Sequence, residues 1–422
     1  VDASVGCVIV ARVRAKSRKQ LTHMTTTSQR MRAWRGPALL TYGFRPFFFG
    51  AGVWAIVSML LWLGMLNGVV APPIALDPVS WHAHEFLFGY LGAVTAGFLL
   101  TAVPNWTGRL PIVGWPLGGL FALWILGRGV VLFSAGMPPL VVALVDLAFP
   151  AVLTATIAWE IIQGRNWKNL LVLGMLVVFA TGNAVFHWEA ARGDYAAQGL
   201  GLRIGLGAGI MMIAVIGGRI VPSFTRNWLV QRGGTGLPAP PMGGFDKVAL
   251  LILLIALLVW VARPQVAVTG GLMIVAAMAH FVRLARWAGH RTGAEALVWS
   301  LHAGYLFLPL GALALGLGTV FQTGLGVAAA QHLWMAGAIG LMTLAVMTRA
   351  TLGHSGQALT SGSGTIALYL LLILSVPARV CAGVIPEQAA WLHMIAGFGW
   401  LGAFGVFIVI YGPLHMARKG QA

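Results

Sequence analysis

The sequence predicts an all-α polytopic membrane protein with about twelve transmembrane helices. Hydrophobic residues make up 59% of the 422 residues, whereas charged residues make up only 9%. Soluble domains carry roughly a quarter charged residues, so a chain this poor in charge, with a mean hydropathy of +0.85, is typical of the bilayer interior. The apolar residues also form long uninterrupted stretches, and about 20 such residues suffice for a helix to cross the hydrocarbon core.

Twelve stretches reach the length that a membrane span requires, and polar or charged segments separate them. The longest of these segments, 223–245, is rich in Gly and Pro and is expected to be a flexible cytoplasmic linker between the two halves. The twelve spans are expected at residues 46–66, 81–104, 112–133, 138–162, 168–190, 202–222, 246–262, 266–286, 295–316, 328–349, 364–383 and 390–412.

These spans define one membrane domain with a short segment on either side. The domain is expected to cover 38–415, and residues 416–422 form a cytoplasmic tail. Residues 1–37 are basic, polar and not periodic, and we interpret them as a cytoplasmic tail or as an over-called start. In the second case, translation would begin at Met24 or Met31.

The basic residues predict the orientation of the chain. The formal net charge is +17, and Lys and Arg concentrate in alternate segments, so the other segments hold only Arg192, Arg203, Arg263 and Arg379. The positive-inside rule then places both termini in the cytoplasm. No separate basic domain is present that would favour nucleic-acid binding. Two cysteines are too few for a disulfide framework or a cysteine metal site.

A weak internal repeat favours three units of four helices. The motif Leu-x-x-Gly-aromatic that begins at Leu40 recurs at Leu301, each time at the start of a span. Spans 2, 6 and 10 each carry an Ala-Val pair near the inner end, followed by Arg109, Arg219 or Arg349. Chance similarity is the alternative in a chain so rich in these small residues, and repeats in membrane proteins are often this weak.

Four histidines fall near the outer ends of spans. His82 and His84 begin span 2, His187 ends span 5 and His332 begins span 10. Ionisable groups at this depth are rare and usually mark a site. A neutral imidazole binds haem iron or copper without adding charge to the membrane. We therefore expect at least two of the four to hold metal or haem iron, although each one alone could be a snorkelling or hydrogen-bonded side chain.

The spacing within span 2 separates its two histidines. On a helix, His82 and His84 point about 200° apart, so they serve two centres, or one is a ligand that the other supports. Glu85 could accept the ring N–H of a ligand histidine or transfer protons. His302 and His354 lie nearer the inner face, where they could hold a second haem.

Other polar residues near the helix ends are candidate contacts of a cofactor or substrate. Those at inner helix ends include three arginines, for which a topology anchor is the simpler interpretation. The alternative is a partner for haem propionates or a quinol headgroup, because guanidinium groups bind carboxylates in a bidentate manner. His280 and His393, in contrast, are expected to be hydrogen-bonded or snorkelling side chains. The candidate contact residues are Arg45, Asn105, Arg109, Asn183 and Arg349.

Five motifs carry a resemblance to a known family. They are Thr41-Tyr-Gly-Phe-Arg45-Pro-Phe-Phe, Trp81-His-Ala-His-Glu85-x-x-x-Gly89, Gly97-Phe-Leu-Leu-Thr-Ala-Val-Pro-Asn-Trp-Thr-Gly108-Arg109, Gly182-Asn-x-x-Phe-His187 and Met347-Thr-Arg-Ala-Thr-Leu-Gly-His354-Ser-Gly. Together they resemble the NnrS family from about residue 38 to the last span, whereas the N-terminal tail does not. The resemblance implies a twelve-span cytoplasmic-membrane protein that carries haem and copper and is associated with denitrification and nitric oxide tolerance. It makes candidate ligands of His82, His84, His187, His302, His332 and His354, without assigning each to a centre.

A second similarity concerns architecture alone. The haem–copper oxidases and nitric oxide reductases also have twelve core helices in a pseudo-threefold arrangement, with histidine ligands on a few inner helices. The suspected three-unit repeat would fit that arrangement. Such a likeness of fold does not establish a reaction.

Three functions remain open at this stage. The first is an enzyme that binds or reduces nitric oxide, with electrons from an unknown donor such as a quinol or a cytochrome. The second is a haem-based sensor or buffer without turnover. The third is a transporter of a metal or small anion, which should have broken helices and polar midplane residues. Asp146 is the only acidic residue well inside a span, and no nucleotide-binding motif is present.

Overall fold

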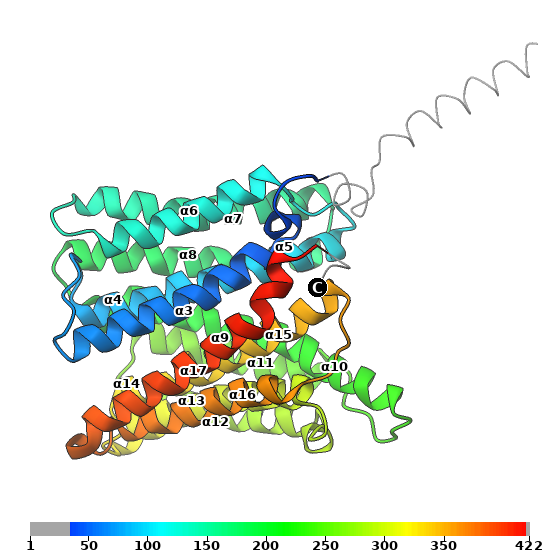
Figure 1. Cartoon of the computed structure of the whole chain (residues 1–422). Coiled ribbons are helices and arrows are strands. Elements are labelled where there is room, and N and C mark those ends of the chain that lie inside the picture. The colour runs from blue at the N-terminus through cyan, green and yellow to red at the C-terminus, as the bar shows by residue number, and fades with distance from the viewer. Residues whose placement is uncertain (1–33, 419–422) are drawn as a thin grey trace, which may run out of the picture.

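The computed structural model describes residues 34–418, and in this range the secondary structure is entirely helical. Twelve helical segments in the described range are long and apolar enough to cross a membrane. They run side by side between two ends of the bundle (Figure 1). The predicted fold class and number of spans are therefore confirmed. Residues 1–33 and 419–422, which include most of both predicted tails, lie outside the described residues.

The first half of the chain contains six spans. They are α3 (Phe44–Leu66); α4 (Pro78–His84) with the π-helical segment η2 (Glu85–Leu91) and α5 (Gly92–Thr107); α6 (Trp115–Leu132); α7 (Pro139–Gln163); η3 (Trp167–Asn169) with α8 (Leu170–Ala191); and α9 (Leu200–Met212) with the π-helical segment η5 (Ile213–Gly217) and α10 (Gly218–Gln231). Two short 3₁₀ turns, η1 (Ala38–Thr41) and η4 (Ala196–Gln198), accompany them.

The second half contains the other six spans. They are α11 (Gly244–Ala262); α12 (Ala267–Ala285) with η6 (Gly289–Arg291); α13 (Ala296–Phe321); α14 (Val327–His332) with the π-helical segment η7 (Leu333–Leu341) and α15 (Met342–Ser355); α16 (Ser363–Cys381); and η8 (Pro386–Gln388) with α17 (Ala389–Met416). Each predicted apolar stretch overlaps one of the twelve spans.

The main difference from the prediction concerns the linker. Helix α10 continues to Gln231, so the first part of the predicted loop 223–245 is helical. Beyond Pro222 this helix is amphipathic: Thr225 and Leu229 are buried, while the residues between them on the other face are exposed. A prediction based on uninterrupted apolar residues stops at the last residue of the apolar stretch. It therefore misses the part of a helix that continues with only one apolar face.

Span 2 also extends past its predicted end. Helix α5 runs through Pro104 to Thr107 and ends at Gly108, which adopts the left-handed conformation with a φ of 70°. The Asn105 side chain donates a hydrogen bond to the backbone carbonyl of Thr101 at 3.2 Å. The carbonyl that Pro104 leaves without an N–H partner is that of Leu100, and membrane helices tolerate such a proline where local adjustments satisfy the freed group.

Spans 2, 6 and 10 form the interior of the bundle. In their most apolar windows 89%, 78% and 67% of the residues are buried, whereas no other described span exceeds 44%. Each of the three contains a π-helical segment, which is uncommon and occurs often at functional sites. These are the same spans that share the Ala-Val pair in the sequence. The three-unit repeat itself stays a prediction.

The three inner spans converge and then separate. Segments η2, α9 and η7 contact one another, but their continuations α5, α10 and α15 have little mutual contact. In Figure 1, α5 and α10 end well apart from each other. The separation leaves space between the three helices at one end of the bundle.

Both ends of the described chain lie at that same end of the bundle (Figure 1). The side chain of Arg418 donates hydrogen bonds to the carbonyls of Arg35 and Gly36, each at 3.2 Å. A chain that crosses the membrane an even number of times must begin and end on the same side. We refer to this end as the inner end, after the orientation that the charge pattern predicts, and to the end that carries the start of α4 as the outer end.

Glycines allow α8 and α9 to pack closely, and this contact is testable. A Cβ atom added at Gly201 would lie 2.3 Å from the backbone nitrogen of Phe186, which cannot move aside easily. We expect Gly201→Ala to lower the free energy of unfolding by about 1–3 kcal/mol, as overpacking does elsewhere. The control is Gly174→Ala on α8, where an added Cβ meets no atom within 4 Å. Equal thermal unfolding midpoints of the two variants in detergent would contradict the prediction.

Candidate functional site

His82 and His84 belong to two separate groups of side chains in the outer half of the bundle. Both lie in α4, and they face different neighbours, as their spacing predicted. His84 contacts residues of α7 and α8. The ring of His82 packs against Trp62 of α3 and His332 of α14. The predicted outer histidines therefore form two sites, which we refer to as the buried charge cluster and the outer histidine pocket.

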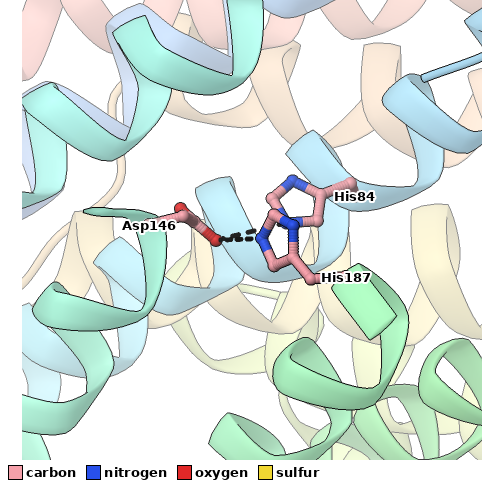
Figure 2. Close-up of side chains that lie close together, drawn as sticks. All are labelled: His84, Asp146 and His187. Carbon is pink, nitrogen blue, oxygen red and sulfur yellow. Dashed lines mark hydrogen bonds and ion pairs between the residues drawn. The ribbon is translucent and has the colours of Figure 1, made fainter. Parts of the chain in front are cut away.

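The buried charge cluster consists of His84, Glu85, Arg128, Asp146, Asn183 and His187, which four neighbouring spans contribute. Nδ1 of His84 lies 2.9 Å from a carboxylate oxygen of Glu85, and Nε2 of His84 lies 2.9 Å from Oδ1 of Asn183. Figure 2 shows the carboxylate of Asp146 facing the imidazoles of both His84 and His187. Its distance to Nε2 of His187 is 3.0 Å. Glu85 thus contacts a histidine ring nitrogen, as predicted.

Arg128 connects the two acids of this cluster. One of its nitrogens donates to both carboxylate oxygens of Glu85 at 2.7 Å, and the other donates to Asp146. The three side chains are at most 5% exposed. Buried charges are tolerated when they are paired and hydrogen-bonded. Because both ring nitrogens of His84 face oxygen acceptors, an imidazolium there would balance the second negative charge.

The cluster contains a group that could hold a metal ion. His84, Asp146 and His187 each offer one ligand atom, and these atoms lie within 4.8 Å of one another. Imidazole and carboxylate donors suit several transition metals. In the structure, however, the same atoms are hydrogen-bonded to one another, and the Arg128 guanidinium lies against Asp146. A metal cation would have to compete with that guanidinium.

The outer histidine pocket consists of His82, His332, His393 and Arg379, within walls formed mainly by apolar residues. Its cavity has a volume of ≈ 60 Å³. The rings of His82 and His332 are nearly parallel, with centroids 6.3 Å apart and an interplanar angle of 11°. Trp62 stacks on His82 at 4.3 Å and fixes the orientation of this imidazole.

The ring nitrogens of this pocket are suited to metal binding. Nδ1 of His332 lies 2.6 Å from the carbonyl of Ala328 and must donate, since a carbonyl only accepts. The lone pair of His332 is therefore on Nε2, and metal-bound histidines are commonly oriented by such a backbone carbonyl. Nδ1 of His82 is buried without a hydrogen-bond partner among the described residues. A buried polar atom without a partner requires an explanation, and a bound metal would supply one.

A larger cavity lies at the inner end, between α5, α10 and α15. Its volume is ≈ 580 Å³, and Asn105, Arg349 and His354 all line it. The guanidinium carbon of Arg349 lies 4.2 Å from the centroid of the Phe224 ring. The ring of His354 stacks on Phe44 at 5.4 Å. The structure thus brings together three predicted site residues from two distant motifs, in what we refer to as the inner cavity.

The other predicted site residues make contacts typical of structural groups. Arg45 donates to backbone carbonyls at both ends of the chain, including that of Ala417 at 2.5 Å. Arg109 forms an ion pair with Glu160 at 2.5 Å, and this pair is partly exposed. Nε2 of His302 lies 2.8 Å from the Thr225 hydroxyl, and His302 does not line the inner cavity. Cofactor roles for Arg45, Arg109 and His302 stay predictions.

Sequence reasoning did not assign four residues to the two outer sites. Asp146 and Arg128 are charged residues inside consecutive spans, so a search for opposite charges in neighbouring spans would have paired them. Arg379 was interpreted only as a topology charge. His393 lines the outer histidine pocket, and its interpretation as a snorkelling or hydrogen-bonded side chain stays a prediction. For His280 that expectation is confirmed, because its Nδ1 lies 2.8 Å from the Tyr305 hydroxyl.

The fold and these sites define a class of protein: a multi-pass membrane protein with a buried group that could hold a metal. A family model described as NnrS protein matches residues 38–419. The chain therefore belongs to the NnrS family, and this membership supports a membrane protein related to nitric oxide. A search among curated proteins found no match.

The pairing of Arg128 in the buried charge cluster yields a stability prediction. Asp146→Asn removes one of its two acidic partners, so we expect the free energy of unfolding to fall by about 3–5 kcal/mol. The control is Asp194→Asn, because Asp194 pairs with Arg192 at 3.7 Å on the surface. An exposed pair of this kind contributes about 0–1 kcal/mol. Denaturant or thermal unfolding compares the two variants, and equal losses would refute the argument.

Proposed function

We propose that this protein binds haem and copper in the bacterial inner membrane and acts in nitric oxide metabolism and tolerance by binding nitric oxide at a histidine-ligated centre. Family membership supports the link to nitric oxide. The observation that carries the proposal is the outer histidine pocket, where the lone pair of His332 is available and a buried nitrogen of His82 has no partner.

The outer histidine pocket suits a single metal ion. Its volume of ≈ 60 Å³ is much smaller than the ≈ 580 Å³ of the inner cavity. Imidazoles such as those of His82 and His332 are suitable copper ligands, and His393 lines the same pocket. Arg379 adds a positive charge to the same pocket. Because repulsion increases with the charge of the ion, Arg379 favours copper in its lower oxidation state.

The inner cavity suits a haem. It offers ≈ 580 Å³ between aromatic walls, and His354 lines it as a candidate iron ligand. Arg349 has no acidic partner among the ion pairs of the described residues, so its guanidinium is available for a propionate. A haem bound there would supply an iron centre for nitric oxide. Asn105 at the same cavity could hydrogen-bond a second polar group of the cofactor.

The separation of the two sites favours binding over turnover. The outer histidine pocket and the inner cavity share no lining residue. Centres at these two places could not act together on one pair of nitric oxide molecules. We therefore favour a buffer or sensor, or electron transfer between the centres. Reduction at one centre, fed by a quinol or cytochrome, is the second candidate, and consumption of nitric oxide under reducing conditions would establish it.

Transport is less well supported by the geometry. A transporter is expected to have unwound helices and polar groups around a midplane site. In the described range the twelve spans are continuous, and three of them contain π-helical segments instead of breaks. The polar residues of the buried charge cluster are hydrogen-bonded to one another.

The metal assignment can be tested by elemental analysis and haem spectra of the purified protein. We expect stoichiometric copper and haem in the wild type. His332→Ala should lose copper and keep haem, because it removes the imidazole with the available lone pair, whereas His354→Ala should lose haem and keep copper. The control is His290→Ala, which changes an exposed histidine. Iron and copper near zero in the wild type would refute the proposal.

The orientation can be tested independently. An excess of Lys and Arg on the inner side supports cytoplasmic termini. A fluorescent reporter fused after Ala422 should therefore be bright, whereas a periplasmic phosphatase at the same position should be inactive. A reporter pair inserted in the outer loop after Gly68 should give the reverse result. An active phosphatase at the C-terminus would invert the proposed topology.

A further inference from the structure

A third cavity lies where the three inner spans meet. Its volume is ≈ 70 Å³, and all residues that line it belong to spans 2, 6 and 10. Val94, Met212 and Val346 represent the three spans in its wall. We refer to it as the central cavity.

The local helix geometry explains why this cavity is present. It lies at the end of η2 and along η5, where π-helical turns return to α-helical ones. Gly209 and Gly217 line it and contribute no side chain. From the central cavity toward the inner end of the bundle, the three inner spans separate. No side chain of a neighbouring inner span therefore fills the space.

The wall of the central cavity is almost entirely apolar. Among the described residues, Thr95 and Thr343 contribute the polar side chains of this wall. The Thr343 hydroxyl lies 2.6 Å from the carbonyl of Ile339 and 2.7 Å from the hydroxyl of Tyr90, so its hydrogen-bonding capacity is used. A buried water requires two to four polar partners, whereas dry apolar cavities bind apolar molecules such as xenon. The central cavity therefore favours a small neutral apolar molecule over water or an ion.

The central cavity lies between the two sites described above. Phe98, Ile220 and Val346 line both the central and the inner cavity, so these two spaces adjoin. On the other side, Tyr90 lines the outer histidine pocket and is hydrogen-bonded to Thr343 of the central cavity. This hydrogen-bonded pair therefore connects the walls of the two spaces.

We propose that the central cavity binds a small neutral gas and conducts it between the inner cavity and the outer histidine pocket, past Tyr90 and Thr343. That the gas is nitric oxide rests on the proposed function. The affinity of the central cavity for apolar gases is independent of the proposed function. This affinity depends only on the size of the cavity and the polarity of its wall.

The first test uses xenon as the probe on the full-length protein in crystals under xenon pressure. We expect xenon in the central cavity of the wild type and its loss in Val94→Phe, because the added ring occupies the space. Val346→Phe, at the half-buried boundary with the inner cavity, is a second variant in case the first does not fold. The control is Val178→Phe on α8, where 47% of the side chain is exposed. A wild-type central cavity without xenon would overturn the proposal.

The second test measures the rate at which nitric oxide associates with the metal-loaded protein, by stopped-flow absorption. Val94→Phe should slow association roughly tenfold while metal and haem content stay unchanged, because Val94 lines the central cavity and neither of the two proposed metal sites. Val178→Phe should associate at the wild-type rate. Unchanged rates in cavity variants that exclude xenon would overturn conduction. Xenon binding in a protein that binds no nitric oxide would instead refute the proposed function and leave the gas cavity established.

Discussion

The pairing of Arg128 with Glu85 and Asp146 constrains the outer half of the molecule. Three charges from three consecutive spans lie in the interior, where each would be very costly alone. Their mutual contacts set how the helices of spans 2, 3 and 4 are rotated about their axes. Since His84 must face this cluster, His82 faces the opposite way, toward His332. The charge cluster thus positions the outer histidine pocket without lining it.

The second half of the chain contains a comparable interaction. Arg283 of α12 forms an ion pair with Asp246 of α11 at 2.6 Å and donates to the Tyr305 hydroxyl at 2.7 Å. It also donates to the carbonyl of Ala214 in η5. In both cases one buried arginine attaches an inner span, span 2 for Arg128 and span 6 for Arg283, to outer spans. Because outer spans hold them, the inner spans can diverge toward the inner end. The space between them then stays open.

Helix geometry and composition predicted part of the site. The 200° separation of two positions on a helix was enough to place His82 and His84 in different groups. Depth along the spans indicated that four histidines lie near one face. Neither argument could show that His187 joins His84 while His393 joins His332. Those partners come from helices distant in the sequence, and depth alone does not distinguish the sides of a helix. The sequence also left two interpretations of Arg45 open, a topology anchor and a cofactor contact, and the structure adds that its guanidinium donates to backbone carbonyls.

The sequence by itself determined the class of fold, the number of spans, the position of each histidine along its span and the family. Each of these properties depends on local composition, or on motifs whose residues are close together in the sequence. Only the tertiary structure decided which helices are inside, where π-helical segments open cavities, and which charges meet. The physical reason is that a span in lipid is apolar on every side, so its sequence carries little information about the direction in which each face packs.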